Sequence, residues 1–177
     1  MSGRIDAFPP VAREDARVLI LGSMPSVASL REGFYYGHPR NAFWRIMADV
    51  FASPLPTDIP AKRALLVDNG VALWDALQSC EREGSLDSAI RDPRPNDFTA
   101  LFAACPGIRR VLFNGAAART LFLRHCGGAL QGRDWLQLPS TSPAYTLSYE
   151  RKLAQWRAAL DPQNGTARAV PAPGAEI

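Results

Sequence analysis

The stretch Leu19-Ile20-Leu21-Gly22-Ser23-Met24-Pro25-Ser26 decides the fold that we predict for this chain. From Val18 it begins as a short apolar run with β-branched residues, which is typical of a buried strand. The run ends at Gly22 and Pro25, as a strand does where it enters a tight turn. The stretch therefore predicts a buried strand followed by a sharp turn.

A polar loop and a helix follow this strand. The loop carries side chains that can contact a ligand, namely Ser23, Ser26, Ser29, Tyr35, Tyr36, His38, Arg40 and Asn41. Phe43, Trp44, Ile46 and Met47 then recur at helical spacing. A strand, a loop and a helix in this order form the first crossover of an α/β domain. Open parallel sheets bind ligands at the carboxyl ends of their strands, which is where this loop lies.

Composition indicates one globular domain. The chain has 177 residues, of which 47 % are hydrophobic and 21 % charged. We find no apolar run of about 18 residues and no basic-then-apolar leader, so we expect a soluble, cytoplasmic protein. Cys80, Cys105 and Cys126 are isolated and stand at no metal-ligand spacing from a histidine. We therefore expect reduced thiols, and neither a metal nor a cofactor.

The basic residues are nearly all arginines. Of 20 Lys and Arg residues only Lys62 and Lys152 are lysines, and the net charge is +3. The arginines reflect either codon composition or contacts to phosphate, which the guanidinium group suits.

The remaining chain alternates between strands and helices. We expect further strands at 71–75, 109–115 and 135–138, and helices at 41–51, 61–67, 97–104, 116–125 and 149–160. Residues 81–95 are polar and predict a long surface loop. This order predicts an α/β fold, a three-layer α/β/α sandwich with a central, mainly parallel four-stranded sheet. We expect an N-terminal arm at 1–16, the domain at 17–161 and a disordered tail at 162–177.

Polar chemistry is concentrated at three strand ends, which should converge at one edge of the sheet. They are Gly22 to Ser26, Asn114-Gly115 and Pro139 to Ser142. Asp75 ends a fourth strand, where it either caps the next element or faces the site. Similarly, Asn41 either caps a helix or acts in the site, and Phe43 either packs in the core or meets a ligand.

Several familiar chemistries lack their motifs. The chain contains no glycine-rich nucleotide motif and no Gly-x-Ser-x-Gly, so a serine hydrolase would depend on Ser23 or Ser140 with His38 and Asp75. What remains is a neutral polar cleft of amides, hydroxyls and aromatic rings. Aromatic faces beside amide groups can hold a flipped nucleobase, and small residues with free backbone amides can contact phosphates.

These residues carry a resemblance to a known family. Gly22 to Ser26 together with Tyr35 to Trp44 resemble the first motif of the uracil-DNA glycosylase superfamily, most closely its hypoxanthine-DNA (deoxyinosine) glycosylase branch. Phe113-Asn114-Gly115 and residues 138–144 resemble the later motifs of that branch, in the same order. The resemblance implies a monofunctional DNA N-glycosylase that flips out and excises a deaminated base, most prominently hypoxanthine, and leaves an abasic site without a metal or cofactor.

Two departures refine this interpretation. Met24 stands where many superfamily members place a water-positioning Asp or Asn, and Leu138 stands where many uracil enzymes have a His. The resemblance then assigns the catalytic amide to Asn41, and both departures argue against efficient uracil excision. The alternatives are a uracil or mismatch-type glycosylase of the same superfamily, and a catalytically silent nucleic-acid-binding domain.

The resemblance also implies roles for other residues. The base would be contacted by Phe43, Asn114, Asp75 and Tyr35. The DNA backbone would be contacted by Gly22, Ser23, Ser26, Arg40, Ser140 and Ser142. The expected partner is double-stranded DNA containing a deaminated base, with single strands as an open alternative, and we expect a monomer.

Overall fold

A sheet of four parallel strands lies at the centre of the computed structural model, which describes residues 3–161. The strands are β2 (Val18–Gly22), β3 (Val71–Asp75), β6 (Arg110–Asn114) and β7 (Asp134–Leu138), in the order β3-β2-β6-β7. All three neighbouring pairs are parallel. The predicted four-stranded sheet is therefore confirmed, with strand ends within about one residue of those expected from the pattern.

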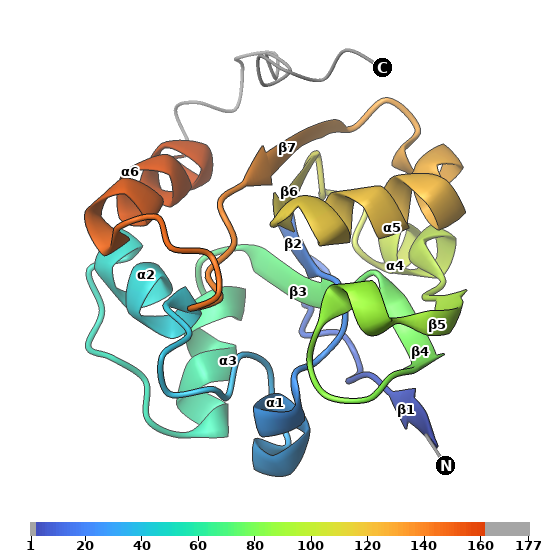
Figure 1. Ribbon diagram of the computed structural model, residues 1–177. Coiled ribbons are helices and arrows are strands. Elements are labelled where there is room, and N and C mark those ends of the chain that lie inside the picture. Colours follow the sequence, from blue (N-terminus) through green and yellow to red (C-terminus); the bar gives the residue numbers. More distant parts are fainter. Residues whose placement is uncertain (1–2, 162–177) are drawn as a thin grey trace.

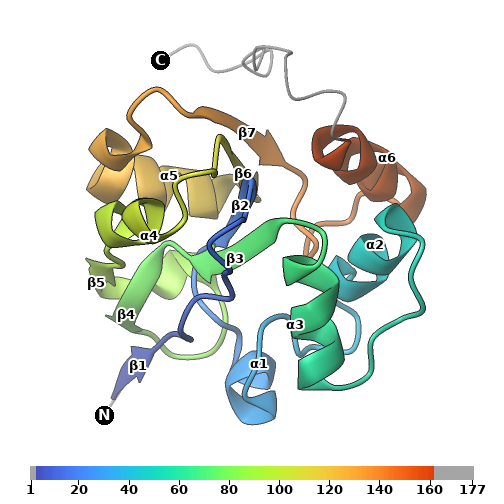
Figure 2. The same ribbon diagram turned by 180° about the vertical axis from the view of Figure 1, so that it is seen from behind.

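Helices cover both faces of this sheet (Figures 1 and 2). On one face lie α2 (Phe43–Val50), α3 (Ile59–Val67) and α6 (Tyr149–Leu160), and on the other lie α4 (Phe98–Ala104) and α5 (Ala116–Cys126). Ile20 packs into the first core, whereas Leu19 and Leu21 pack into the second. Because successive strand residues point to opposite faces, a strand covered on both sides is apolar throughout. The α/β/α sandwich is confirmed.

A second, smaller sheet corrects one prediction. It consists of β1 (Arg4–Asp6), β4 (Leu77–Glu81) and β5 (Arg91–Pro95), which pair antiparallel in the order β1-β4-β5. The prediction that residues 81–95 form a long surface loop is therefore wrong, although the segment between β4 and β5 contains only the short 3₁₀ helix η1 (Asp87–Ala89). The prolines of β5 are accommodated because β5 is an edge strand, where a missing N–H breaks no ladder.

A short helix interrupts the loop predicted after β2. This helix, α1 (Val27–Glu32), begins at Ser26, whose Oγ accepts a hydrogen bond from the Ser29 N–H at 3.1 Å. It ends at Gly33, which has a φ of +78°. A hydroxyl N-cap and a left-handed glycine are ordinary helix boundary signals, so the sequence contained the information for this helix.

The predicted N-terminal arm is held against the domain by several hydrogen bonds. β1 pairs with β4, Val11 exchanges backbone hydrogen bonds with Leu73, and the Tyr35 hydroxyl donates to the Pro9 carbonyl at 2.8 Å. At the other end α5 leads through the 3₁₀ helix η2 (Gly127–Leu130) to β7. The predicted disordered tail at 162–177 lies outside the described residues.

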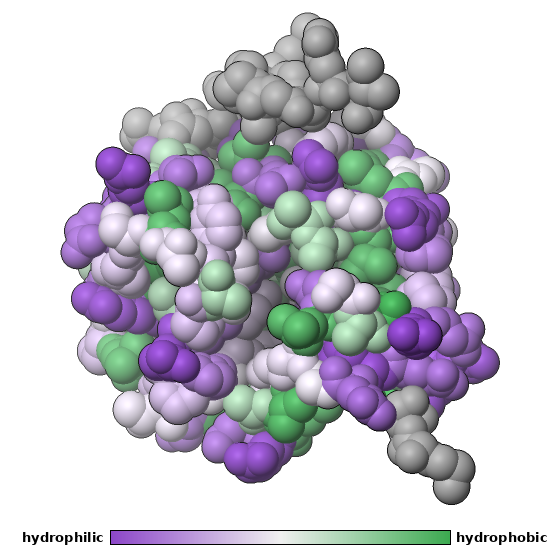
Figure 3. All heavy atoms as spheres, viewed as in Figure 1, coloured by the Kyte–Doolittle hydropathy of each residue, from purple (hydrophilic) through white to green (hydrophobic). Residues whose placement is uncertain are grey.

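The surface is mixed in character. Figure 3 shows hydrophilic side chains (purple) spread over the face seen in Figure 1, with hydrophobic ones (green) in smaller patches between them. Within residues 3–161, no helix combines the length and the apolar character needed to cross a membrane.

The two-sided core predicts a contrast between neighbouring residues of α5. Phe122 is fully buried, whereas Leu123 is 37 % exposed. We expect Phe122→Ala to lower the free energy of unfolding by about 3–5 kcal/mol, because it removes buried area and leaves a cavity. Leu123→Ala should change it by about 0.5 kcal/mol or less. Urea unfolding monitored by circular dichroism measures both, and similar losses would contradict this placement of α5.

Candidate active site

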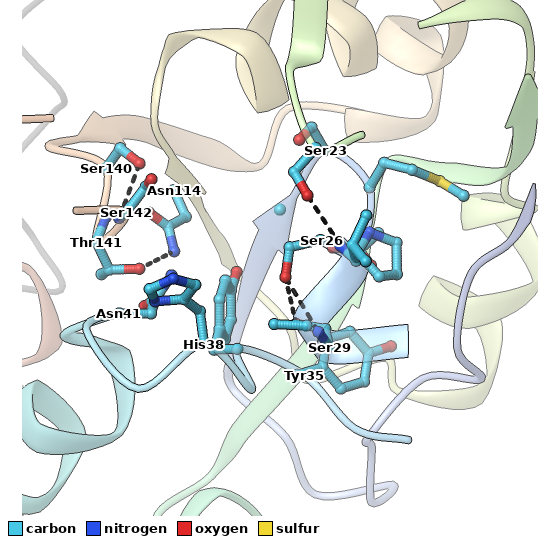
Figure 4. Close-up of a pocket in the computed structure, with 18 of the residues that line it drawn as sticks. Ser23, Ser26, Ser29, Tyr35, His38, Asn41, Asn114, Ser140, Thr141 and Ser142 are labelled. Atoms are coloured by element: carbon cyan, nitrogen blue, oxygen red, sulfur yellow. Dashed lines mark hydrogen bonds between the residues drawn. The ribbon is translucent and has the colours of Figure 1, made fainter. Parts of the chain in front are cut away.

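A cavity of about 420 Å³ lies at the carboxyl ends of β2, β3 and β6. Figure 4 shows its two walls: Ser23, Ser26, Ser29 and Tyr35 lie on one side, and His38, Asn41, Asn114, Ser140, Thr141 and Ser142 lie on the other. The three polar strand ends identified in the sequence therefore do converge. Parallel pairing requires this, because it brings the carboxyl ends of neighbouring strands to one edge.

The first wall is the turn after β2, held by hydroxyl hydrogen bonds. Ser23 Oγ donates to Asp87 Oδ1 at 2.6 Å, which joins the turn to η1. Ser29 Oγ accepts from the Gly37 N–H at 3.0 Å, which fixes the return of the loop. Met24 is only 8 % exposed and packs with Leu77 and Cys80 of β4. Met24 is therefore held by apolar packing against the small sheet. The same residue also borders the cavity.

The second wall depends on a reciprocal pair of hydrogen bonds. Asn114 Nδ2 donates to Thr141 Oγ1 at 3.0 Å, and Asn114 Oδ1 accepts from the Thr141 N–H at 2.9 Å. Beside it, Gly115 has a φ of +92°, and a Cβ there would lie 3.1 Å from Ser140 Cβ. The Asn-Gly at the end of β6 thus joins that strand to the loop after β7. Ser140 Oγ accepts from the Ser142 N–H at 3.2 Å within the same loop.

Helix α6 supports this loop from behind with two residues that the sequence reasoning missed. Lys152 Nζ donates to the Ser142 carbonyl at 3.0 Å, and Trp156 Nε1 donates to the Pro139 carbonyl at 3.0 Å. Lys152 is only 4 % exposed, and its burial lowers the pKa of the ammonium group. Lys152 and Trp156 lie four residues apart and therefore share one face of the helix. This spacing is the sequence pattern from which their shared role could have been predicted.

The position of Asn41 allows both interpretations that the sequence left open. Its Oδ1 accepts from the Phe43 N–H at 3.0 Å, which is a capping hydrogen bond at the start of α2. Asn41 also lines the cavity. Its neighbour Ala42 donates its N–H to the Thr141 carbonyl at 3.0 Å, so the start of α2 is attached to the second wall. The amide is therefore held in place at the cavity edge.

The aromatic residues occupy different layers. Phe43 is fully buried and does not line the cavity, so a base would not reach its ring in this structure. Tyr36 lines the cavity and stacks on Phe43, with ring centroids 4.2 Å apart. Tyr35 also lines the cavity, but its hydroxyl is bonded to the N-terminal segment. Tyr36 is therefore the ring that Phe43 supports from behind.

Asp75 faces the cavity, which is one of the two positions that the sequence left open for it. The residue is 3 % exposed and lines the cavity, and its pKa is raised to about 7. Burial is the main cause, and the charge of Asp87 adds to it, whereas Arg82 opposes it. The pKa of the Tyr36 phenol is also raised, first by burial and then by the charge of Asp75.

Arg40 is exposed beside the cavity rather than within it, and its backbone N–H donates to His38 Nδ1 at 3.1 Å. No group of three His, Cys, Asp or Glu residues in the described chain could hold a metal ion.

The two serine hydroxyls that a serine hydrolase would need form hydrogen bonds with other groups. Ser23 donates to Asp87, and Ser140 accepts from a backbone N–H in its own loop. Among residues 3–161, no hydrogen bond joins either serine to His38. The arrangement therefore does not support an activated serine nucleophile, which requires a base within hydrogen-bonding reach.

Comparisons with known proteins agree with this fold. A sequence profile of the uracil DNA glycosylase superfamily matches residues 9–161. A protein from Methanosarcina acetivorans named hypoxanthine DNA glycosylase is 37 % identical over 153 residues, covering 85 % of this chain and 94 % of the relative. One of the same name from Methanosarcina barkeri is 39 % identical over 109 residues, covering 61 % and 69 % of the two chains.

A solved structure is also similar. It is the solution NMR structure of a Methanosarcina acetivorans protein provisionally described as a uracil DNA glycosylase, with a TM-score of 0.76 and 35 % identity. The match covers 89 % of this chain and 97 % of that one. By sequence and by fold, this chain belongs to the uracil DNA glycosylase superfamily.

Proposed function

We propose that this protein is a DNA glycosylase that excises hypoxanthine from DNA and leaves an abasic site. The observation that carries the proposal is the cavity at the strand ends, where the amides of Asn41 and Asn114 lie beside the supported ring of Tyr36 and the carboxyl group of Asp75. The names of the two similar Methanosarcina proteins support hypoxanthine as the substrate. The packing of Met24 also favours it, because a thioether cannot position a water for attack.

Asn41 is the proposed catalytic residue. Its Oδ1 accepts one hydrogen bond from the Phe43 N–H, and a carbonyl oxygen has a second lone pair that can accept from a water. That water attacks C1′ of the sugar while the bond from C1′ to N9 breaks. The base takes the bonding electrons and leaves as an anion, and the proton lost by the water passes through solvent to that anion, which gives neutral hypoxanthine and a C1′ hydroxyl. Because an oxocarbenium-like centre reacts readily, a weakly basic group suffices if it holds the water in line.

The flipped base is proposed to stack on Tyr36, which Phe43 supports from behind. Phe43 then contributes to base binding only by supporting Tyr36, and Tyr35 contributes by shaping the first wall of the cavity. Beyond its bond to Thr141, Asn114 has a second N–H beside the Tyr36 hydroxyl, and this donor can turn to stabilise negative charge on the departing purine.

The sugar-phosphate backbone is proposed to lie across the two loops at the cavity mouth. The contacts would come from Gly22, Ser23, Ser26, Ser140 and Ser142, whose small side chains leave backbone donors accessible, and from the exposed Arg40. We propose double-stranded DNA as the substrate and a monomer as the active form. The three free thiols support action in the reducing cytoplasm.

The activity itself is tested with labelled duplexes that carry a single inosine, uracil, xanthine or preformed abasic site. After incubation, alkali cleaves the strand wherever a base has been lost. We expect cleavage at inosine to exceed cleavage at uracil. Preferential cleavage at uracil would favour the uracil-type alternative, and no excision from any lesion would favour a silent DNA-binding domain.

The role of Asn41 predicts a loss of turnover without a loss of binding. We expect Asn41→Ala to slow single-turnover excision at saturating enzyme by about 100-fold or more, because the attacking water loses its position. Affinity for the inosine duplex, measured by fluorescence anisotropy, should change little.

The matched control for this variant is Asp58→Ala. Asp58 caps α3 by accepting from the Ala61 N–H at 2.8 Å and does not line the cavity, so its loss removes a comparable cap outside the proposed active site. Each variant should lose about 1 kcal/mol of stability. Only Asn41→Ala should lose turnover, and a wild-type rate for it would refute the catalytic role.

The DNA contact by Arg40 predicts a change in salt dependence. We expect Arg40→Ala to weaken duplex binding and to reduce the slope of log affinity against log salt by about 0.9, as for one lost phosphate contact. Arg109 is the control, because it is exposed and precedes β6, at the opposite edge of the sheet. Arg109→Ala should leave the slope unchanged, and equal effects of the two variants would contradict this orientation of DNA.

A further inference from the structure

The carboxyl group of Asp75 is buried without a full set of partners. Asp75 ends β3, and the register of the sheet places it directly beside Gly22 of β2. Its Oδ2 is buried and makes no hydrogen bond within the described chain. The buried hydroxyl of Tyr36 also lacks a hydrogen bond of regular geometry, although the Asn114 side chain lies close enough to oppose the rise of the phenol pKa. Buried polar atoms are nearly always paired, so two unpaired ones lining a single cavity indicate a ligand that supplies their partners.

Gly22 explains how these groups reach the cavity. A Cβ on Gly22 would lie 2.5 Å from Asp75 Oδ1 and 3.0 Å from the Tyr36 hydroxyl. Any side chain at this position would therefore displace the carboxyl group, the phenol or both. The glycine at the end of β2 leaves the space that the two polar groups occupy beside the cavity.

The charges around Asp75 do not neutralise it. Arg82, which directly follows β4, donates to the carbonyls of Pro25 and Gly84, and among residues 3–161 no ion pair with Asp75 is formed. Asp87 of η1 contributes a like charge, and Tyr35 and Tyr36 are uncharged neighbours from the loop before α2. Burial is the dominant effect, and together these influences raise the pKa of Asp75 to about 7. The neutral acid is therefore available near neutral pH.

We infer that Asp75 recognises the flipped base as a neutral carboxylic acid, with its hydroxyl donating to the carbonyl O6 of hypoxanthine and its carbonyl accepting from N1–H. This inference rests on the proposed function and specifies how its site reads the substrate. A neutral acid offers one donor and one acceptor, which matches the adjacent C=O and N–H of a deaminated base. A carboxylate offers only acceptors and would repel O6.

The inference predicts how excision depends on pH. The acid is neutral below the pKa and charged above it, so wild-type single-turnover excision from an inosine duplex should fall about tenfold per pH unit in the alkaline range. Asp75→Asn keeps one donor and one acceptor at every pH. Its rate should lack this fall between about pH 7 and pH 8.5, where N1–H of the base is still protonated, and should exceed the wild-type rate at about pH 8.5. Asp75→Leu offers neither group and should be at least about tenfold slower than Asp75→Asn throughout.

A second measurement does not depend on activity. Titration of the ¹³C-labelled aspartate carboxyl carbons of the DNA-free protein by NMR, with Asp75 assigned by its loss in Asp75→Asn, should show a midpoint near 7. A midpoint near the ordinary value of about 4 would overturn the inference, even if the variants fold poorly. An alkaline fall retained by Asp75→Asn, or equal rates for Asp75→Asn and Asp75→Leu, would also overturn the inference. The proposed function would still stand in that case, provided that the wild type excises hypoxanthine. No excision by the wild type would overturn both.

Discussion

The parallel register of β2 against β3 is the constraint on which the site depends. It places Gly22 beside Asp75, and the second parallel pair, β2 with β6, brings Asn114 to the same edge. A shift of one residue would turn every side chain of β2 to the opposite face, which both apolar cores resist. The hydrophobic packing of Ile20 on one side and of Leu19 and Leu21 on the other therefore fixes the positions of the polar groups.

The site is built from loops, yet few of its groups are free to move. Thr141 is bonded to both ends of the Asn114 amide, and its carbonyl accepts from Ala42 beside Asn41. Lys152 and Trp156 hold the same loop from α6. A reaction that needs a water held in line benefits from such support, because small displacements of a positioning group cost large factors in rate.

Much of this could be predicted from the sequence, for identifiable reasons. The apolar runs at Val18 and Val71 predicted strands because parallel strands are buried on both faces. The small sheet escaped prediction because β5 is an exposed edge strand with two prolines, a pattern that resembles a loop. The aromatic layers also escaped it, because sequence spacing does not distinguish Phe43, which is buried, from Tyr36, which lines the cavity. The supporting role of Lys152 escaped it as well, because its only sequence signal is its spacing from Trp156 on α6.

The central claim is that the cavity beside Asn41 receives a flipped purine. The most direct test is a crystal structure of the protein bound to a duplex containing 2′-fluorodeoxyinosine, whose electron-withdrawing fluorine slows cleavage of the glycosidic bond. The account predicts hypoxanthine outside the helix stack, against the ring of Tyr36 and within hydrogen-bonding distance of Asp75, with C1′ facing Asn41. A base that remains stacked in the duplex, or one that enters a different part of the protein, would contradict it.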